Sequence, residues 1–360
     1  MTDKGKRKLK SGFTTGACAS AAAKAAAMLL LTGEKVKKVD IPFPGGDRHS
    51  FALHSCFLHA GQGAASIIKD AGDDPDVTNG AEIIALVEQQ KEGGQEQIVL
   101  SGGKGVGTVT KPGLPIPVGE PAINPVPREM IRAAVQEAMK EADSFPLLQV
   151  TIRVANGEEL AEKTLNSRLG ILGGLSILGT TGIVRPVSAK AWTDTIDASM
   201  SVARAAGLKE VIVSTGRTSE AAVQDLLHLP EEAQVMMGDY LSYALKSAHQ
   251  HGFEHVHLSG MWAKILKCAL EIPQTHVRNG ALEVHHALDL LVKLGLEKDI
   301  AANFADANTA REIFYRLVKM GKQEIVKRVC LQAKVYAMKE SGLPVEVYLV
   351  TSEDGVVVHV

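Results

Sequence analysis

Residues 210–220 read Glu-Val-Ile-Val-Ser-Thr-Gly-Arg-Thr-Ser-Glu, a short apolar run that passes through a glycine into a polar segment. An apolar run of this length is typical of a buried strand, and the glycine allows a tight turn into a helix. Further strand patterns lie at 234–237, 255–258 and 345–350, with helical patterns between them. This alternation predicts parallel strands joined by crossover helices, which is a Rossmann-like arrangement.

The first half of the chain has a different, mixed order of elements. Periodicity and turn residues predict a helix with Thr15 as its N-cap, a hairpin over 39–58 and a helix from Asn79. They also predict a strand at 98–100, a helix over 131–142 and a strand at 148–154. A chain of 360 residues is long enough for two domains. We therefore expect a mixed α+β domain over residues 1–188, followed by a smaller Rossmann-like parallel-sheet domain over 189–360.

The composition is typical of a soluble globular protein. Hydrophobic residues make up 45% of the chain and charged residues 22%, which argues against extensive disorder. The formal net charge is −2, so there is no global basic field to hold nucleic acid. We therefore expect a partner other than nucleic acid.

The amino-terminal stretch looks slightly like a signal peptide, because basic residues precede an apolar run. Lys24 interrupts that run, and its uninterrupted part, residues 25–31, is too short to cross a bilayer. We expect a helix here and no membrane segment. No CxxC spacing occurs among the cysteines, and scattered cysteines suit a reducing, cytoplasmic location. The cysteines are Cys18, Cys56, Cys268 and Cys330.

Six residues directly after the predicted parallel strands are candidates for cofactor binding: Thr215, Gly216, Thr218, Asp239, Ser259 and Gly260. Open parallel sheets bind ligands beyond the carboxyl ends of their strands. Helix-start amides near Thr218 could hold a carboxylate, and Asp239 could accept hydrogen bonds from ribose hydroxyls. An adenosyl amino acid needs both functions. No GxGxxG motif is present, and ordinary strand–helix turns are the alternative.

Two glycine-rich stretches, residues 101–107 and 170–182, lie in the first half. Backbone amides of such loops can hold anions, and basic side chains lie in or near them. We predict a cationic, amide-rich cleft for a polycarboxylate, formed by Thr14, Thr15, Gly16, Lys104, Arg128 and Arg185. Neither stretch is a P-loop, and glycines that only serve turns are the alternative.

Acidic and histidine residues give weaker signals. Asp70, Asp73, Asp74 and Asp76 could hold a hard metal ion, but a polar turn is the favoured interpretation. His255 and His257 would share one face of a strand, and without HExxH or a converging partner we predict no metal site. His276 lies in a predicted loop near the strand ends, where it could orient a substrate or move a proton.

Several long stretches together resemble one family. They are Ser11–Ala19, Lys69–Thr78, Gly119–Arg128 and Gly173–Pro186, followed by Gly238-Asp239-Tyr240 and Thr275-His276. In this order they resemble the CbiD family over about residues 8–350. The resemblance implies transfer of a methyl group from S-adenosylmethionine to C1 of cobalt-precorrin-5B, giving cobalt-precorrin-6A. It also implies a fold unlike that of the common tetrapyrrole methyltransferases, with the cobalt carried by the substrate.

The loops described above, and not the resemblance, assign a separate binding role to each half of the chain. Residues 1–188 would bind the cobalt-precorrin tetrapyrrole, and residues 189–360 would bind S-adenosylmethionine. His276 or Asp73 would help to remove a proton. A homo-oligomer and transient contacts with other cobalamin-pathway enzymes both stay open. The alternatives are a small-metabolite phosphotransferase, which would need nucleotide and Mg²⁺, and a non-catalytic tetrapyrrole-binding pathway protein.

Overall fold

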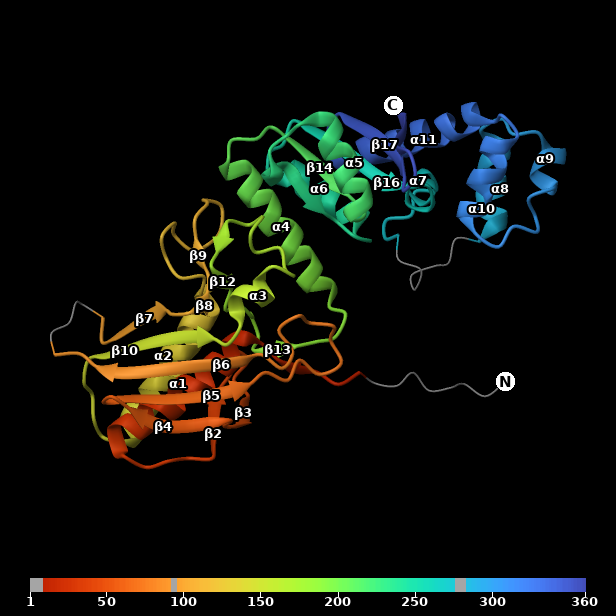
Figure 1. Ribbon diagram of the computed structural model, residues 1–360. Helices are drawn as coiled ribbons and strands as arrows, with labels where there is room; N and C mark the ends of the chain where they lie inside the picture. Colours follow the sequence, from red (N-terminus) through yellow and green to blue (C-terminus); the bar gives the residue numbers. More distant parts are fainter. Residues whose placement is uncertain (1–8, 92–95, 276–282) are drawn as a thin grey trace, which may run out of the picture. The chain divides into compact units, whose positions relative to one another are not determined.

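The chain folds into two compact units, Met1–Ser188 and Ala189–Val360 (Figure 1). The computed structural model describes residues 9–91, 96–275 and 283–360. The binding role assigned to each unit stays a prediction.

The first unit is built on a mixed five-stranded sheet. Its strands, in spatial order, are β4 (Ser55–His59), β5 (Gln62–Ile68), β6 (Glu82–Gln89), β10 (Leu148–Val154) and β7 (Ile98–Gly102). Neighbouring strands are antiparallel except β10 and β7, which are parallel. The expected mixed α+β character of this half is thus confirmed.

Helix α1 (Thr15–Thr32) is the core of this unit, packed against the sheet and against α2 (Pro125–Glu141). Eight of its residues from Ala17 to Ala27 are alanines, and all of them are buried. These small side chains allow very close approach: a Cβ added to Gly63 of β5 would lie 2.1 Å from the Ala26 carbonyl oxygen. The sheet therefore tolerates only glycine where it crosses the helix.

A short polar residue caps the start of α1, and a glycine caps its end, as is usual for helices. Thr14, rather than the predicted Thr15, is the N-cap, because its backbone is extended and its hydroxyl accepts from the Ala17 amide at 3.2 Å. Gly33 ends the helix in the left-handed region with φ 76°. By length and composition alone α1 could cross a membrane, but 78% of its apolar window is buried inside the protein, which favours a core helix.

One cation lies buried within this alanine-rich core. The Lys24 side chain is 5% exposed, and its Nζ donates to Glu137 at 3.0 Å and Glu141 at 2.7 Å on α2. Arg48 also donates to Glu137, at 2.8 Å. Hydrogen bonds from Arg48 and then Lys24 lower the pKa of Glu137 to about 2. The cluster therefore ties α1, α2 and the β-hairpin together through charge-assisted hydrogen bonds.

The helix predicted from Asn79 is wrong: Glu82–Gln89 form strand β6. Residues 79–82 imitate a capping box, but the Asn79 side chain instead accepts from the Ala71 amide at 2.9 Å. Within the strand, Ile83, Ala85 and Val87 are buried at every second position. Period-two burial between β5 and β10 therefore decides the structure of this segment.

Short strand pairs complete the first unit. The predicted hairpin forms from β2 (Lys38–Pro42) and β3 (Arg48–Ala52), while residues 55–58 belong to β4 of the main sheet. The other pairs are β1 (Gly12–Phe13) with β13 (Ile183–Val184), β8 (Gly105–Val106) with β12 (Gly174–Leu175), and β9 (Thr108–Val109) with β11 (Ile171–Leu172). A short helix, α3 (Gly157–Ala161), lies between β10 and β11 in the sequence.

The second unit contains the predicted, largely parallel sheet. Its spatial order is β15 (Gln234–Met236), β14 (Glu210–Ser214), β16 (His255–Met261), β17 (Val345–Thr351) and β18 (Gly355–His359). All neighbouring pairs are parallel except β17 and β18. The antiparallel edge strand β18 was not predicted, because its few residues follow β17 after a tight turn.

Helices cover both faces of this sheet. On one face α5 (Arg217–Leu227) packs its Val223 against Ile212 and Val350. The larger core lies on the other face, where most of the remaining helices pack. These are α4 (Ala189–Ala205), α6 (Leu241–Gln250), α7 (Trp262–Ala269), α8 (Val284–Lys293), α9 (Lys298–Ala302), α10 (Ala310–Lys319) and α11 (Gln323–Ser341), with a 3₁₀ turn at Glu231–Ala233.

The strand order creates a switch point beside β14. The chain leaves β14 through α5, pairs β15 on one side, and later places β16 on the other side. The helices that follow β14 and β16, α5 and α7, contribute to the cores on opposite faces. Loops at such a point diverge and leave a crevice at the carboxyl ends of the strands.

Because β5 approaches α1 closely, we predict that one methyl group added at Gly63 has a large effect on the stability of the protein. We expect Gly63→Ala to destabilise the protein by about 3 kcal/mol or more, because the added Cβ meets backbone that cannot move independently. Gly45→Ala is the matched control, since nothing lies within 4 Å of its added Cβ, and it should change stability by less than about 1 kcal/mol. Urea unfolding measures both, and equal effects would contradict the packing described.

Candidate functional site

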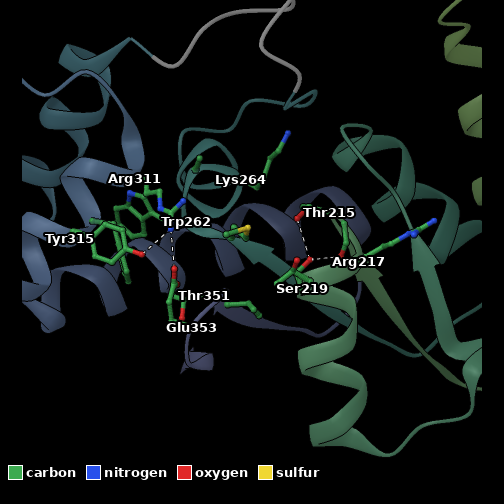
Figure 2. Close-up of a pocket in the computed structure, with 15 residues that line it drawn as sticks. Thr215, Arg217, Ser219, Trp262, Lys264, Arg311, Tyr315, Thr351 and Glu353 are labelled. Atoms are coloured by element: carbon green, nitrogen blue, oxygen red, sulfur yellow. Dashed lines mark hydrogen bonds and ion pairs between the residues drawn. The ribbon is translucent and has the colours of Figure 1, made fainter. Parts of the chain in front are cut away.

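A pocket of about 310 Å³ lies at the switch point of the second unit, beyond the carboxyl ends of β14, β16 and β17 (Figure 2). Its walls come from the first turns of α5 and α7, from α10, and from the residues where β17 ends. The volume is at the lower end of the range for small-molecule sites. The topology and the cavity thus indicate the same place for a ligand.

The start of α5 forms one side of the pocket. Its first turn, Arg217, Thr218 and Ser219, lines the cavity, and among the described residues no side chain caps it. First-turn amides have no acceptor within the helix, and the helix dipole favours an anion beside them. A Cβ added at the N-cap, Gly216, would meet nothing within 4 Å, so a ligand can approach the backbone closely. This side can therefore bind a carboxylate or a phosphate.

Aromatic side chains form the opposite side. Trp262, Phe314 and Tyr315 line the pocket, with ring centroids 5.4 Å apart for Trp262 and Phe314 and 5.6 Å apart for Phe314 and Tyr315. Trp262 is buried, and its Nε1 has no hydrogen-bond partner in the part of the chain that the structure describes. Buried indole N–H groups usually have an acceptor. The aromatic side suits a flat apolar group.

Charged side chains surround the aromatic wall. Arg311 donates to the Tyr315 hydroxyl at 3.2 Å and to the Glu353 carboxylate at 3.0 Å, as the dashed lines in Figure 2 show. Arg217 and Lys264 also line the pocket. The cationic groups therefore outnumber the acidic ones here, which again favours an anionic or zwitterionic ligand.

Three of the six predicted cofactor residues line this pocket: Thr215, Gly216 and Thr218. Ser259 lies behind them, fully buried, and its hydroxyl donates to the Ser219 carbonyl at 2.6 Å. Gly260 lies between Thr215 and Ile265, where an added Cβ would be 3.3 and 3.2 Å from their side chains. Ser259 and Gly260 thus shape the pocket from behind.

Asp239 lies beside the pocket, at the end of the loop that follows β15. Its carboxylate forms an ion pair with Lys264 and accepts from the Thr275 hydroxyl at 3.0 Å. Asp239 therefore holds a lysine that does line the cavity. A direct hydrogen bond from Asp239 to a ribose stays a prediction.

The two glycine-rich stretches of the first unit pack against each other. A Cβ added to Gly174 would lie 2.4 Å from backbone atoms of Gly105. A Cβ added to Gly157, which lies between the two stretches in the sequence, would lie 2.2 Å from the Gly105 carbonyl oxygen. The pairing of β8 with β12 brings these backbones together. Close backbone packing accounts for these glycines, as the structural alternative expected.

The helix start of α1 is also engaged within the protein. The Gly16 amide donates to the Leu178 carbonyl at 3.1 Å, and the Thr15 hydroxyl accepts from the Leu178 amide at 2.9 Å. The Thr14 hydroxyl caps the helix, and both threonines are buried. A role for these residues in binding substrate stays a prediction, and it would require the 178–182 segment to move.

The three predicted substrate-binding cations differ in their exposure and in the partners that hold them. Arg128 donates to the carbonyls of Ile123 at 2.7 Å and Pro121 at 3.0 Å and pairs with Glu120 at 3.1 Å, so it braces its own loop. Lys104 and Arg185 are exposed. These two side chains are therefore better placed than Arg128 to meet carboxylates from outside.

The acidic residues 70–76 form a polar turn, as favoured from the sequence. Asp73 is exposed and accepts from the Lys10 amide at 2.7 Å, while Asp76 pairs with the buried Lys69 at 2.5 Å. Within the described ranges, these carboxylates do not converge as a metal-binding group. The proton-transfer role of Asp73 stays a prediction, and His276 lies outside the described residues.

Six residues outside the loops after β14 and β16 line the pocket and were not predicted from the sequence: Arg311, Phe314, Tyr315, Val350, Thr351 and Glu353. Thr351 is the last residue of β17, so the strand-end rule, applied to the fourth parallel strand, would have found it. The three residues of α10 carry no such signal. Their position depends on how α10 packs against α7, which periodicity does not specify.

The cysteines are poorly suited to nucleophilic chemistry. Cys18, Cys268 and Cys330 are buried, and Cys56 is partly exposed. Burial raises the pKa of Cys18 and of Cys330 to about 12, and it also raises that of Cys268. Thiolates, which are the reactive form, are therefore rare at neutral pH.

Comparisons with known proteins cover nearly the whole chain. The family model CbiD matches residues 2–186, and the model of the CbiD C-terminal domain matches residues 274–360. Three similar proteins carry the name cobalt-precorrin-5B C(1)-methyltransferase. They are from Desulfotalea psychrophila (57% identity, 96% of each chain), Geobacter metallireducens (48%, 91% of each) and Geobacillus sp. (40%, 96% of this chain and 95% of the other). A solved structure, a cobalamin biosynthesis protein (cbiD) from Archaeoglobus fulgidus, shares 31% identity over 72% of this chain and 79% of that one, with a TM-score of 0.40.

Cysteine burial predicts a pattern of chemical modification. With iodoacetamide at about pH 8, the native protein should be alkylated at Cys56 first, because thiol reactivity follows thiolate fraction and access. Cys18, Cys268 and Cys330 should react only after unfolding in urea, which serves as the control. Peptide mass spectrometry measures the order. Modification of native Cys18 as fast as Cys56 would show that α1 is not the buried core.

Proposed function

The chain belongs to the CbiD family, and on this premise we propose that it methylates C1 of cobalt-precorrin-5B in cobalamin biosynthesis. Support comes from relatives of that name, which match it over 96% of its length at 57% identity and 91% at 48%. Neither alternative, a phosphotransferase or a non-catalytic carrier, has comparable support. The cobalt belongs to the substrate in this proposal.

We further propose S-adenosylmethionine as the methyl donor, bound in the pocket of the second unit. The observation that carries this proposal is the crevice at the β14–β16 switch point, lined by the first turn of α5. The amino-acid carboxylate of the donor would lie against the α5 amides near Thr218. The adenine would lie against the aromatic side formed by Trp262 and Phe314.

The protein's part in such a transfer is mainly positional. The methyl sulfonium is already electrophilic, so the ring carbon forms a bond to the methyl carbon while the C–S bond breaks and its electron pair goes to sulfur. Alignment of donor and acceptor and exclusion of water supply the rate increase. His276 and Asp73 stay our candidates for the group that removes a proton.

For the substrate we propose contacts with exposed cations of the first unit. A precorrin is fringed with carboxylates, and Lys104 and Arg185 are exposed near the packed glycine stretches. Arg128, Thr14, Thr15 and Gly16 would contribute only after rearrangement, because their polar groups already have partners. We also propose a cytoplasmic location, which the free cysteines support.

The activity is tested with methyl-labelled S-adenosylmethionine and cobalt-precorrin-5B. We expect the label to appear at C1 of the product, located by NMR, together with one equivalent of S-adenosylhomocysteine. Binding of the macrocycle without transfer would favour the carrier alternative. Nucleotide-dependent phosphorylation with no transfer would favour the phosphotransferase.

The donor site is tested by removing one amide from the first turn of α5. Arg217→Pro deletes the N–H of the first helical residue, where proline is well tolerated after the extended Gly216. Arg217→Ala keeps that N–H and removes the same side chain, so it is the matched control. Loss of a charged hydrogen bond of about 1.5–3 kcal/mol should weaken S-adenosylmethionine binding by roughly 10- to 150-fold in the proline variant relative to the alanine variant. Calorimetry measures both, and equal affinities would place the carboxylate elsewhere.

A further inference from the structure

A second group of polar side chains lies on the same sheet as the pocket, near the opposite ends of the strands. His255 and His257 alternate along β16, so both side chains lie on one face. Glu346 of β17 is the register partner of His257. His255 is six residues from Met261 at the pocket, or about 20 Å along the strand. The histidine–glutamate cluster, meaning these three residues, is therefore separate from the proposed donor site.

The potential ligand atoms of this cluster converge. One nitrogen from each histidine and a carboxylate oxygen of Glu346 all lie within 4.8 Å of one another. His257 Nδ1 is 3.5 Å from Glu346 Oε2, and the two imidazole centroids are 4.7 Å apart. In a tetrahedral site with bonds of about 2.0–2.2 Å, ligand atoms lie about 3.3–3.6 Å apart. One pair already has this spacing, and small side-chain rotations would bring in the third ligand.

Neighbouring groups hold His257 and Glu346 in place. His257 Nε2 lies 2.8 Å from a Glu210 oxygen, which leaves Nδ1 facing Glu346. The buried Tyr348 hydroxyl donates to Glu346 at 2.5 Å and lies 3.1 Å from His257 Nδ1. A carboxylate that orients a histidine from behind is the usual second layer of a metal site. His257 itself is only 5% exposed, so its orientation is fixed by packing.

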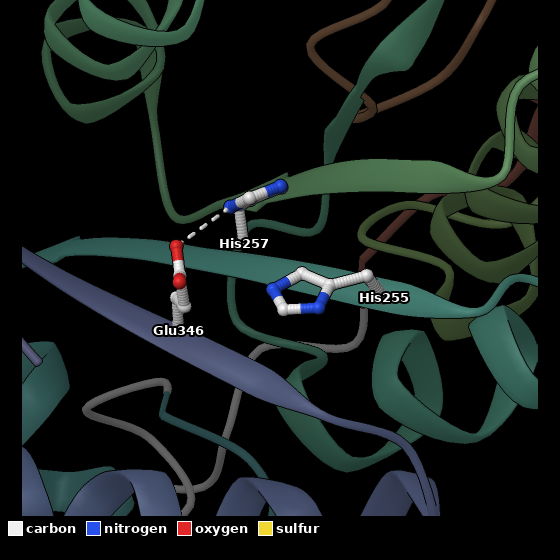
Figure 3. A group of neighbouring side chains, drawn as sticks. All are labelled: His255, His257 and Glu346. Carbon is white, nitrogen blue, oxygen red and sulfur yellow. Dashed lines mark ion pairs between the residues drawn. The ribbon is translucent and has the colours of Figure 1, made fainter.

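The hydrogen bonds of His257 and Glu346 do not account for one buried atom of the cluster, His255 Nε2. This nitrogen has no hydrogen-bond partner among the residues that the structure describes. Figure 3 shows the His255 ring beside His257 and pointing toward Glu346. A buried polar atom without a partner is costly, and native structures rarely retain one without a reason. A bound cation would satisfy this nitrogen and both neighbouring ligands together.

We propose that His255, His257 and Glu346 bind a divalent transition-metal ion, of which Zn²⁺ fits the donor set best. Two imidazoles and one carboxylate are a common zinc ligand set, and water would complete the coordination. The sequence analysis predicted no metal here because only the two histidines were visible. Glu346 lies 89 positions after His257, and only the pairing of β16 with β17 brings it beside them. The ion would join these two strands at the end away from the pocket.

The other histidine group in the described part of the chain offers a matched control. Glu283, His285 and His286 also come within ligand distance of one another, but all three are exposed on the solvent side of α8. Exposed neighbours of this kind commonly contact each other without a metal. Their histidine content makes them the appropriate test of whether binding depends on the buried cluster.

The test is metal binding by the full-length protein after treatment with EDTA. Titration with Zn²⁺, and with Co²⁺ followed by its visible absorption, should show one ion per chain in a four-coordinate nitrogen–oxygen site. His255→Ala removes a side chain whose Nε2 makes no hydrogen bond within residues 9–91, 96–275 and 283–360, so the variant should fold and lose binding at least about 100-fold. Glu210→Gln should weaken binding roughly 10- to 100-fold. His285→Ala should bind like the unchanged protein.

Thermal unfolding provides a second readout that does not involve methyl transfer. Zn²⁺ should raise the Tm of the unchanged protein and of His285→Ala but not that of His255→Ala, because an ion that binds only the folded state stabilises it. The proposal is overturned if no ion binds, if His255→Ala binds as tightly as the unchanged protein, or if His285→Ala loses the ion. None of these outcomes depends on the methyltransferase proposal.

Discussion

The switch in strand order beside β14 is the constraint on which the second unit depends. Two parallel neighbours, β14 and β16, send the helices that follow them to opposite faces of the sheet. Their loops consequently separate, and the first turn of α5 is left facing a cavity instead of another helix. Helix-start amides attract negative charge, so the topology favours an anionic group at this site. The aromatic residues of α7 and α10 then make one wall of that site apolar.

In the first unit, one helix, α1, is buried on nearly every side. Alanines along α1 let β5 and α2 approach closely, and glycines such as Gly63 and Gly16 remove the last Cβ atoms in the way. The glycine stretches near residues 105 and 174 are used in the same manner, for backbone packing. These glycines therefore allow close backbone packing within the first unit, whereas the side chains of Lys104 and Arg185 are exposed.

Features of the fold and of the candidate site could be predicted from the sequence where they depend on neighbouring residues, and not where they depend on residues distant in the chain. Apolar runs such as 210–214 identified all four parallel strands, and the loop after β14 correctly indicated three pocket residues. The helix predicted from residues 79–82 was wrong because a capping pattern is a local signal. The burial that makes 82–89 a strand comes from pairing with β5 and β10. Arg311 and Glu346 could not be assigned, because their partners are distant in the sequence and meet them only through tertiary packing.

We propose that the methyl donor binds in the second unit at the β14–β16 switch point. The most direct test of this proposal is a crystal structure of the protein with S-adenosylhomocysteine. The account predicts density for the amino-acid carboxylate at the first turn of α5 and for the adenine beside Trp262. Density for the ligand at the glycine stretches of the first unit, with the α5 pocket filled only by solvent, would contradict it.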